Sequence, residues 1–257
     1  MTALTAPQAM LAGGRTNQVW RDRDIVWKRY LPQNATPLFA NDPDAEWIVL
    51  NALKGQGIAP DPVSRETRSG ATYLAYRHLI GKTHATPMSD LARLMGRLHA
   101  LSAPPSLPQS TMGNRVVAEG MVMAGGDPVL LAITPDAPDQ PLHRAFCHRD
   151  PVPGNVVQTP DGPRLIDWQC PGQGDPIEDI AHALSPAMHA LYGSTAPTTQ
   201  DREAFLDAYP DEVAADRYRT QGRAFHWRMA CYCHWQVARG NVAYGPALTA
   251  ELDFLNG

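Results

Sequence analysis

Short apolar runs separated by turn residues fill the first third of the chain, a pattern typical of strands. Two such runs, over residues 18–21 and 24–30, flank a polar Asp-Arg pair and predict a β-hairpin. A later run over residues 71–79 predicts a third strand, which ends at Gly81. Between them, residues 44–54 carry apolar side chains at helical spacing and precede two glycines, which predicts a helix.

Beyond residue 87 the apolar positions recur mainly with a helical period. Helices are predicted over residues 91–101, 114–123, 177–191, 202–208 and 214–239. The stretch over residues 103–142 is otherwise rich in Pro and Gly and predicts little regular structure. Two short strands, over residues 155–158 and 164–167, are predicted around a Thr-Pro-Asp-Gly turn.

This order, strands first and helices afterwards, predicts an α+β chain in two lobes. We expect residues 1–80 to form a small N-terminal lobe with an antiparallel sheet, and residues 81–257 to form a larger helical lobe.

Composition narrows the class of protein. Of the 257 residues, 44% are hydrophobic and 19% are charged, and the net charge of −4 makes nucleic acid an unexpected partner. No apolar stretch approaches the roughly 20 residues that span a bilayer, and the N-terminus lacks the early positive charge of a signal peptide, so we expect a cytoplasmic protein without a membrane partner. The four cysteines form no C-x-x-C pair and are expected to be small buried fillers. The nine histidines form no H-E-x-x-H motif, which disfavours an enzyme with a histidine-bound metal and disfavours a structural zinc.

One segment gathers the polar residues that phosphoryl transfer needs. His148, Arg149 and Asp150 are followed after four intervening residues by Asn155, and the predicted hairpin delivers Asp167. Phosphoryl transfer requires a carboxylate that accepts the proton of the acceptor hydroxyl, and hard oxygen ligands for Mg²⁺. Asp150 is the candidate base, and Asn155 and Asp167 are the candidate metal ligands. A lone H-R-D tripeptide is more often a capped turn, but this spacing favours a phosphotransfer site.

The same segment resembles the aminoglycoside phosphotransferase and choline kinase superfamily, small-molecule kinases with a protein-kinase-like fold. The family's H-x-D-x-x-x-x-N motif matches residues 148–155, its aspartate with a following aromatic residue matches Asp167 and Trp168, and its G-D-P-x-x-D-I-A motif matches residues 174–181. The resemblance runs from about residue 11 to residue 239. It implies a two-lobed kinase-like fold, with the nucleotide bound by residues 1–80 and the catalytic and acceptor-binding residues in 81–257. It also implies ATP and Mg²⁺ as cofactors and a small hydroxylated molecule as acceptor, with no obligatory protein partner. Val152 stands where protein kinases usually carry a lysine, so a protein substrate is not expected.

The resemblance also implies a phosphate-binding loop near the N-terminus. Gly13, Gly14, Thr16 and Asn17 match the G-G-x-[ST]-N opening of choline kinase-like members. Glycines allow the backbone to approach phosphates closely, and the two polar side chains can add donors. Taken alone, without the resemblance, these residues are better explained as a plain glycine turn.

The strand and helix after this loop match the cation pair of the family. Lys28 stands where a cation reaches the α- and β-phosphates, and Glu46 matches the glutamate that pairs with it. Arg29 competes with Lys28 for this role, because strand alternation lets only one of them face the cleft. The third predicted strand matches the hinge, where backbone groups from Arg77 to Leu79 would bind adenine.

Other polar residues of the catalytic segment are expected to brace the loop rather than bind substrate. These are His148, Arg149, Asp175 and Asp179, of which Asp175 stands at the N-cap of the next helix. His99, in an earlier helix, is expected to be structural as well.

The acceptor is the least legible part of the sequence. Trp227, Tyr232 and Trp235 in the predicted helix over residues 214–239 either pack in the core or form a cation–π cage for an ammonium group. This aromatic supply, together with acidic residues that resemble a solvated helix face, favours a small amino alcohol of the choline or ethanolamine type. Gln169, where choline kinases carry an acid, speaks against it. An aminoglycoside-type antibiotic is the alternative acceptor, and a pseudokinase without turnover or a hydrolase is the alternative of another class.

Overall fold

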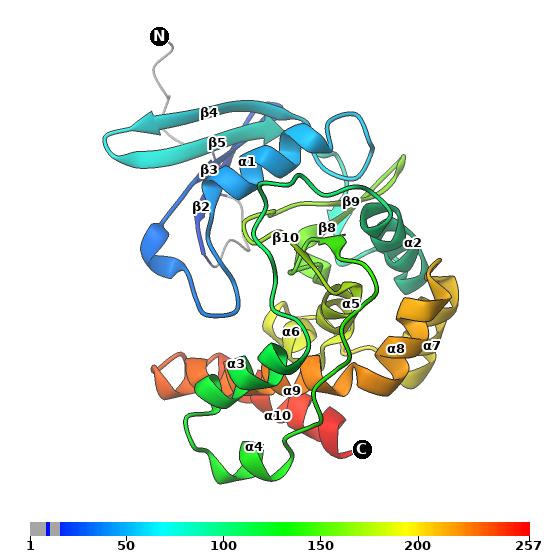
Figure 1. The fold of residues 1–257 in the computed structure, drawn as a ribbon. Helices are drawn as coiled ribbons and strands as arrows, with labels where there is room; N and C mark the ends of the chain where they lie inside the picture. Colours follow the sequence, from blue (N-terminus) through cyan, green and yellow to red (C-terminus); the bar gives the residue numbers. More distant parts are fainter. Residues whose placement is uncertain (1–8, 11–15) are drawn as a thin grey trace.

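The structure is a computed structural model that describes residues 9–10 and 16–257. A sheet with one helix forms one end of the molecule, and helices form most of the other end (Figure 1). The predicted α+β architecture is confirmed. The boundary near residue 80 stays a prediction, because Val26 and Tyr76 of the sheet share one continuous core with residues of the helical part such as Leu91 and Phe146.

The N-terminal sheet has the strand order β1-β2-β3-β5-β4, and all its pairings are antiparallel. Its strands are β1 (Ala9–Met10), β2 (Gln18–Asp22), β3 (Ile25–Arg29), β4 (Pro62–Arg68) and β5 (Ala71–Arg77). Strands β2 and β3 form the predicted hairpin. Strand β4 was not predicted, because it starts at a proline and carries mostly polar residues, as edge strands do. The predicted helix, α1 (Pro43–Ala52), begins at Asp42, whose side chain caps it.

Two short sheets carry the catalytic segment. Strands β8 (Val156–Thr159) and β9 (Gly162–Leu165) form the predicted hairpin, and β6 (Lys82–Thr83) pairs with β8. Strand β7 (Ala145–Cys147) pairs with β10 (Gly172–Gly174). The second hairpin strand ends two residues before Asp167, so this aspartate lies in the loop that follows the strand.

Helices make up most of the remaining chain. They are α2 (Met88–His99), α3 (Asn114–Ala124), α4 (Pro128–Ala132), α5 (Pro176–Leu184), α6 (Pro186–Leu191), α7 (Thr199–Ala208), α8 (Glu212–Gln221), α9 (Arg223–Ala238) and α10 (Tyr244–Asn256). Helices α4 and α10 were not predicted.

Two predicted helices are each divided in the structure. The helix expected over residues 177–191 breaks at Ser185, where Pro186 lacks the N–H that would continue it and Ser185 caps α6 instead. The helix expected over residues 214–239 breaks at Gly222, which ends α8 and precedes α9. A Cβ at Gly222 would lie 2.6 Å from the carbonyl oxygen of Tyr218, so the close turn depends on glycine.

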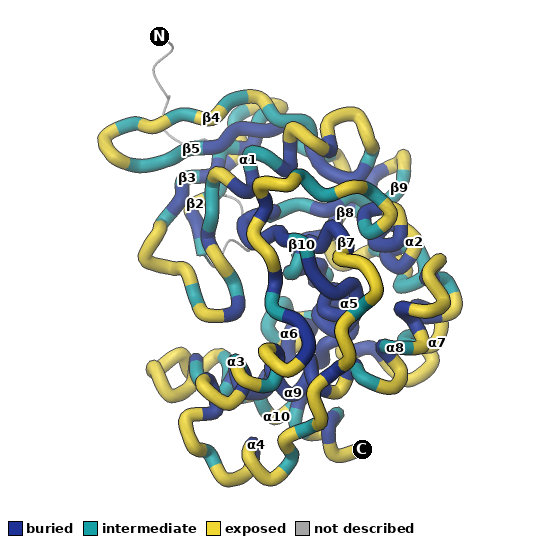
Figure 2. The backbone as a smooth tube through the Cα atoms, in the orientation of Figure 1, coloured by how far each residue is buried: buried dark blue, intermediate teal, exposed yellow. Residues whose placement is uncertain are grey.

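Helix α5 lies at the centre of the molecule. All of its residues are buried, and it runs as a dark segment through the middle of Figure 2. Its position beneath the loop after β7 lets its polar side chains reach the catalytic segment. The four cysteines are free and buried, as predicted.

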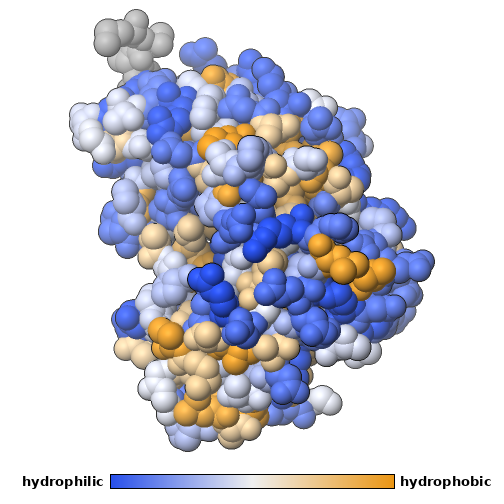
Figure 3. All heavy atoms as spheres, viewed as in Figure 1, coloured by the Kyte–Doolittle hydropathy of each residue, from blue (hydrophilic) through white to orange (hydrophobic). Residues whose placement is uncertain are grey.

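The outer surface is mostly polar on the face drawn in Figure 3, and apolar side chains gather at its lower end. Exposed apolar residues of helices α3 and α4 include Met121, Val122, Val129 and Leu131. Among the described residues, no helix is long and apolar enough to cross a bilayer.

Candidate active site

The loop after β7 is held by one buried carboxylate. Asp179 of α5 accepts hydrogen bonds from the backbone N–H groups of His148, at 2.8 Å, and Arg149, at 2.6 Å. Arg149 has a positive φ of 68°, which residues other than glycine rarely adopt. His99 Nε2 lies 3.0 Å from the same carboxylate. Asp179 and His99 therefore brace the loop, as expected from the sequence.

His148 links the start of this loop to the strand that precedes Asp167. Its Nε2 lies 3.0 Å from the carbonyl oxygen of Ile166, and its Nδ1 lies 3.2 Å from the backbone nitrogen of Asp150. Burial lowers the pKa of His148, so the ring is neutral. The neutral ring then donates from Nε2 to Ile166 and accepts at Nδ1 from Asp150.

Acidic residues at the start of α5 anchor basic residues around the loop. Asp175 caps the helix by accepting from the backbone N–H of Ile177 at 3.1 Å, and it pairs with Arg217 at 2.8 Å. Glu178 pairs with Arg149 at 3.3 Å. Although burial opposes its ionisation, the charges of Arg149 and Arg228 lower the pKa of Glu178 to about 2. Asp175 and Arg149 thus have the supporting positions predicted for them.

Asp150, Asn155 and Asp167 meet at one point. Asn155 Nδ2 donates to both the carbonyl oxygen and Oδ2 of Asp150, at 3.0 Å each. The backbone N–H of Ile166 donates to the carbonyl oxygen of Asn155 at 2.9 Å, which places the next residue, Asp167, beside them. The structure therefore brings together the three residues that the sequence singled out for catalysis and metal binding.

Asp150 is prepared to accept a proton. It is 5% exposed, and its Oδ1 has no hydrogen-bond partner in the described part of the chain. Burial, together with the negative charge of Asp167, raises the pKa of the Asp150 carboxyl, and the hydrogen bond from Asn155 opposes this. A buried oxygen without a partner is uncommon in a folded protein and marks a place where a ligand can bind.

Lys28 is the cation of this site. Its Nζ lies 2.6 Å from Glu46 Oε2 and also contacts the Asp167 carboxylate. Burial lowers the pKa of Lys28, but the charges of Asp167 and Glu46 outweigh this and raise it above its ordinary value, so the amine is protonated. Lys28 is 1% exposed, whereas the half-buried Arg29 donates a solvent-exposed hydrogen bond to Gln18. Strand alternation therefore directs Lys28, not Arg29, toward the catalytic residues.

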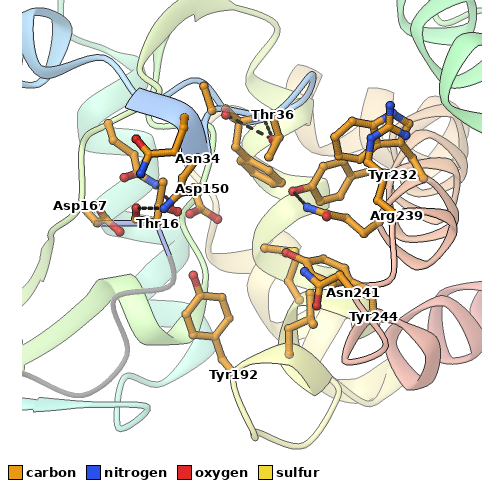
Figure 4. A pocket seen from close by; sticks show the side chains of 18 residues that line it. Thr16, Asn34, Thr36, Asp150, Asp167, Tyr192, Tyr232, Arg239, Asn241 and Tyr244 are labelled. Carbon is orange, nitrogen blue, oxygen red and sulfur yellow. Dashed lines mark hydrogen bonds between the residues drawn. The ribbon is translucent and has the colours of Figure 1, made fainter. Parts of the chain in front are cut away.

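Two cavities meet at Asp167. The first, which we call the hinge cavity, measures about 570 Å³, and its lining includes Val26, Tyr76, His78, Leu79, Asn155 and Asp167. The second, which we call the Asp150 cavity, measures about 470 Å³, and its lining includes Thr16, Asn34, Asp150, Asp167, Tyr232 and Trp235 (Figure 4). Tyr192 lines both cavities. Two ligands, one in each cavity, would thus approach each other at the carboxylates.

The chain matches the model of one protein family over most of its length. The model of the Phosphotransferase enzyme family matches residues 9–221, which is most of the sequence. The chain belongs to this family. No curated protein matches it.

Solved structures of kinases share the fold of this phosphotransferase. A choline/ethanolamine kinase family protein from Mesorhizobium loti superposes with a TM-score of 0.69 at 16% identity, over 99% of this chain and 88% of that one. Choline kinase from Streptococcus pneumoniae gives a TM-score of 0.63 at 15% identity, over 96% and 92% of the two chains. Spectinomycin phosphotransferase, solved with ADP and spectinomycin, gives a TM-score of 0.61 at 11% identity, over 95% and 88%. These likenesses confirm the predicted two-lobed kinase-like fold.

The predicted phosphate-binding loop of the phosphotransferase is only partly described. Gly13 and Gly14 lie outside the described residues. Thr16 lines the Asp150 cavity rather than the hinge cavity. The Asn17 side chain lines neither, because its amide is buried between Asn41, at 2.7 Å, and Gln169, at 2.8 Å. This amide cluster ties the loop to the segment that follows Asp167.

The adenine contact predicted at the hinge involves backbone groups from Arg77 to Leu79 and stays a prediction. The Arg77 side chain pairs with Asp24, and its backbone N–H donates to the carbonyl oxygen of Asp61 at 2.9 Å. Arg77 does not line the hinge cavity, whereas Leu79 and its neighbour His78 do.

The predicted aromatic cage needs a correction. Trp227 is fully buried, and its Nε1 donates to the carbonyl oxygen of Leu130 at 2.9 Å, so it belongs to the core and does not line the Asp150 cavity. Tyr232 and Trp235 do line the Asp150 cavity, and their rings are stacked with centroids 6.1 Å apart. The guanidinium of Arg239, however, lies 3.8 Å from the centre of the Trp235 ring. One face of that ring is therefore already covered by a cation of the protein itself.

Sequence reasoning missed the loop between β3 and α1. Gln33, Asn34, Thr36 and Phe39 of this loop line the Asp150 cavity, although they come from the N-terminal third. Leu38 anchors the loop, because it is 2% exposed and packs in the same core cluster as residues of α3, α6, α9 and α10. No local pattern signals such a contact between distant segments.

Proposed function

We propose that this protein transfers a phosphoryl group from MgATP to a hydroxyl group of a small molecule. The observation that carries the proposal is the convergence of Asp150, Asn155, Asp167 and Lys28 at the junction of two cavities. The hinge cavity would hold the nucleotide, and the Asp150 cavity would hold the acceptor. Phosphoryl transfer depends mainly on such positioning and on charge stabilisation.

Each residue of the cluster has a role that its contacts support. The unpartnered Oδ1 of Asp150 accepts the proton of the acceptor hydroxyl as the hydroxyl oxygen bonds to the γ-phosphorus of ATP and the bond from this phosphorus to ADP breaks. Asn155 holds that carboxylate in orientation through its Nδ2. Lys28, kept charged by Glu46 and Asp167, neutralises phosphate oxygens.

The chemistry of the donor set fits Mg²⁺. Both hydrogen bonds that the Asn155 side chain makes to Asp150 come from Nδ2, which leaves its Oδ1 for a metal, and Asp167 supplies carboxylate oxygens. Hard oxygen ligands of this kind are those that Mg²⁺ prefers. When bound, the ion would offset the negative charge of the phosphates.

For the acceptor, a small amino alcohol is the proposal that the cavity supports best. Among the described residues, the carboxylates that line the Asp150 cavity are Asp150 and Asp167 alone. An aminoglycoside carries several positive charges, each of which needs a partner once desolvated, and this lining offers too few. Tyr232 supplies aromatic surface for one ammonium group, of the ethanolamine or choline type.

The proposal is tested by ADP release from MgATP with a panel of alcohols that contains ethanolamine, choline, serine, homoserine, sugars and kanamycin. We expect at least one small alcohol to raise ADP release well above the rate in water. Asp150→Asn should lower that turnover by at least about 1,000-fold while MgATP still binds, because the variant keeps the shape but not the base. Tight MgATP binding with no acceptor-dependent ADP in the whole panel would contradict the proposal and identify a pseudokinase. ADP release that no alcohol accelerates would instead indicate a hydrolase.

A further inference from the structure

The end of the Asp150 cavity that lies away from the catalytic carboxylates is built around a cation. Figure 4 shows Asp150 and Asp167 on one side of the cavity and Arg239, Asn241 and Tyr244 on the opposite side. Arg239 follows the last residue of α9, and it has no ion-pair partner within the described ranges of the chain. A cation that lines an acceptor cavity without a carboxylate partner is available to a ligand.

The stacking on Trp235 fixes how this cation is presented. With the guanidinium carbon 3.8 Å from the ring centre, one face of the guanidinium is covered by the indole. The N–H groups lie in the plane of the guanidinium, so stacking leaves them available at its edge. A planar fork of this kind matches the two oxygens of a carboxylate.

Neutral amide groups surround the same end of the cavity. Gln236, one turn before Arg239, donates from Nε2 to the Tyr232 hydroxyl at 2.6 Å, and Asn241 lines the cavity beside them. Among the described residues that line this end, Arg239 therefore brings a positive charge and none brings a negative one. A lone ammonium group would be repelled there, whereas an acid group would be attracted.

We propose that the acceptor bears an acid group, most simply a carboxylate, which Arg239 binds while the hydroxyl of the same molecule faces Asp150. This inference rests on the proposed function and narrows it to hydroxy acids, including amino alcohols that carry a carboxylate. Arg239 sets specificity by charge, and Trp235 is the platform that orients it.

Matched pairs of acceptors test the proposal, since serine differs from ethanolamine, and homoserine from 3-aminopropan-1-ol, by one carboxylate. We expect kcat/KM to be at least tenfold higher for the acid of the preferred pair, as for a charge-assisted hydrogen bond. Arg239→Gln should abolish this preference, mainly by raising KM for the acid. Arg115→Gln, an exposed arginine of α3 outside the cavity, is the matched control and should leave the preference intact. Glycerol 3-phosphate against glycerol shows whether a phosphate serves as the acid group.

Binding gives a readout that does not depend on turnover. In the presence of MgADP, serine or homoserine should raise the Tm of the wild type but not that of Arg239→Gln. Equal or better use of ethanolamine and 3-aminopropan-1-ol would overturn the acid subsite while leaving phosphotransfer intact. An acid preference that survives in Arg239→Gln would overturn the role of Arg239. Absence of acceptor-dependent ADP from every alcohol would contradict the proposed function instead, and the Tm shifts would still decide whether Arg239 binds an acid.

Discussion

Lys28 and Arg29 are neighbours on β3 with the same charge and opposite surroundings. Lys28 is buried between Glu46 and Asp167, whereas Arg29 bonds to Gln18 outside the site. The pair offers a test in which the two substitutions remove the same charge from adjacent positions.

We expect Lys28→Met to lower kcat/KM for ATP by at least about 100-fold, the scale seen when one charge-stabilising donor is removed from a transition state. Arg29→Met should change kcat/KM for ATP by less than about threefold, because Arg29 lines neither cavity. Steady-state ADP release at varied MgATP measures both. Lys28→Met leaves the buried carboxylate of Glu46 and the half-buried carboxylate of Asp167 without this cation, so circular dichroism must show that the variant is folded. Similar losses in the two variants would contradict the assignment of Lys28.

At the scale of elements, the catalytic segment could be predicted from the sequence because its residues are close together in the chain. The strands around residues 156–165, the cap at Asp175 and the meeting of Asp150 with Asn155 all follow from local spacing. Pro186 is a sequence signal for the break between α5 and α6, because proline cannot continue a helix. The apolar residues keep a helical period on both sides of it, however, and this pattern predicted one continuous helix.

The lining of the Asp150 cavity could not be predicted in the same way. Its residues come from the loop before α1, the end of α6 and the end of α9, which contact each other only in the folded chain. Trp227 and Trp235 illustrate the difficulty, because both lie on α9 and only the second reaches the cavity. Aromatic density alone does not distinguish a core position from a ligand contact.

A buried histidine of helix α5 is expected to lower the stability of the folded protein in acid. His182 is buried, and its Nδ1 lies 2.6 Å from the carbonyl oxygen of Arg149, just before Asp150. Burial, reinforced by the charge of Arg228, lowers the pKa of His182 from 6.5 to about 4. The unfolded chain therefore binds this proton more readily than the folded one, and stability is lost as the pH falls from 6.5 to about 4.

We expect His182 to account for about 2 kcal/mol of the free energy of unfolding that the wild type loses between about pH 7 and pH 5. His182→Gln can still donate to Arg149, so it should lack this part of the pH dependence. Urea unfolding of both proteins at the two pH values measures it. His143→Gln, an exposed histidine before β7, serves as the control. If His182→Gln loses as much stability on acidification as the wild type, the neutral buried imidazole is not the cause.

For the whole molecule, the question is how the sheet and the helical part are held around the two cavities. The loop before α1 inserts Leu38 among the helices, and the Asn17, Asn41 and Gln169 amides join the same loop to the segment after Asp167. On the other side, the chain that leaves β5 passes against β8 at Gly81, which also lines the hinge cavity. The relative position of the two parts therefore depends on close backbone packing at this passage.

Gly81→Ala tests that dependence. A Cβ at Gly81 would lie 2.3 Å from the carbonyl oxygen of Gln158 and 2.7 Å from Val157 Cγ1, so the chain must move away from β8. We expect a loss of about 2 kcal/mol of stability, or roughly 4–8 °C in Tm, as for other overpacked sites in proteins of this size. The hinge cavity would be distorted at the same time, so the affinity for MgATP should fall by at least about tenfold, measured by calorimetry. In Gly245→Ala, the added Cβ meets no atom within 4 Å, and this control in α10 should be neutral or slightly more stable. A Gly81→Ala variant with wild-type Tm and wild-type MgATP affinity would show that the passage beside β8 does not set the geometry of the nucleotide site.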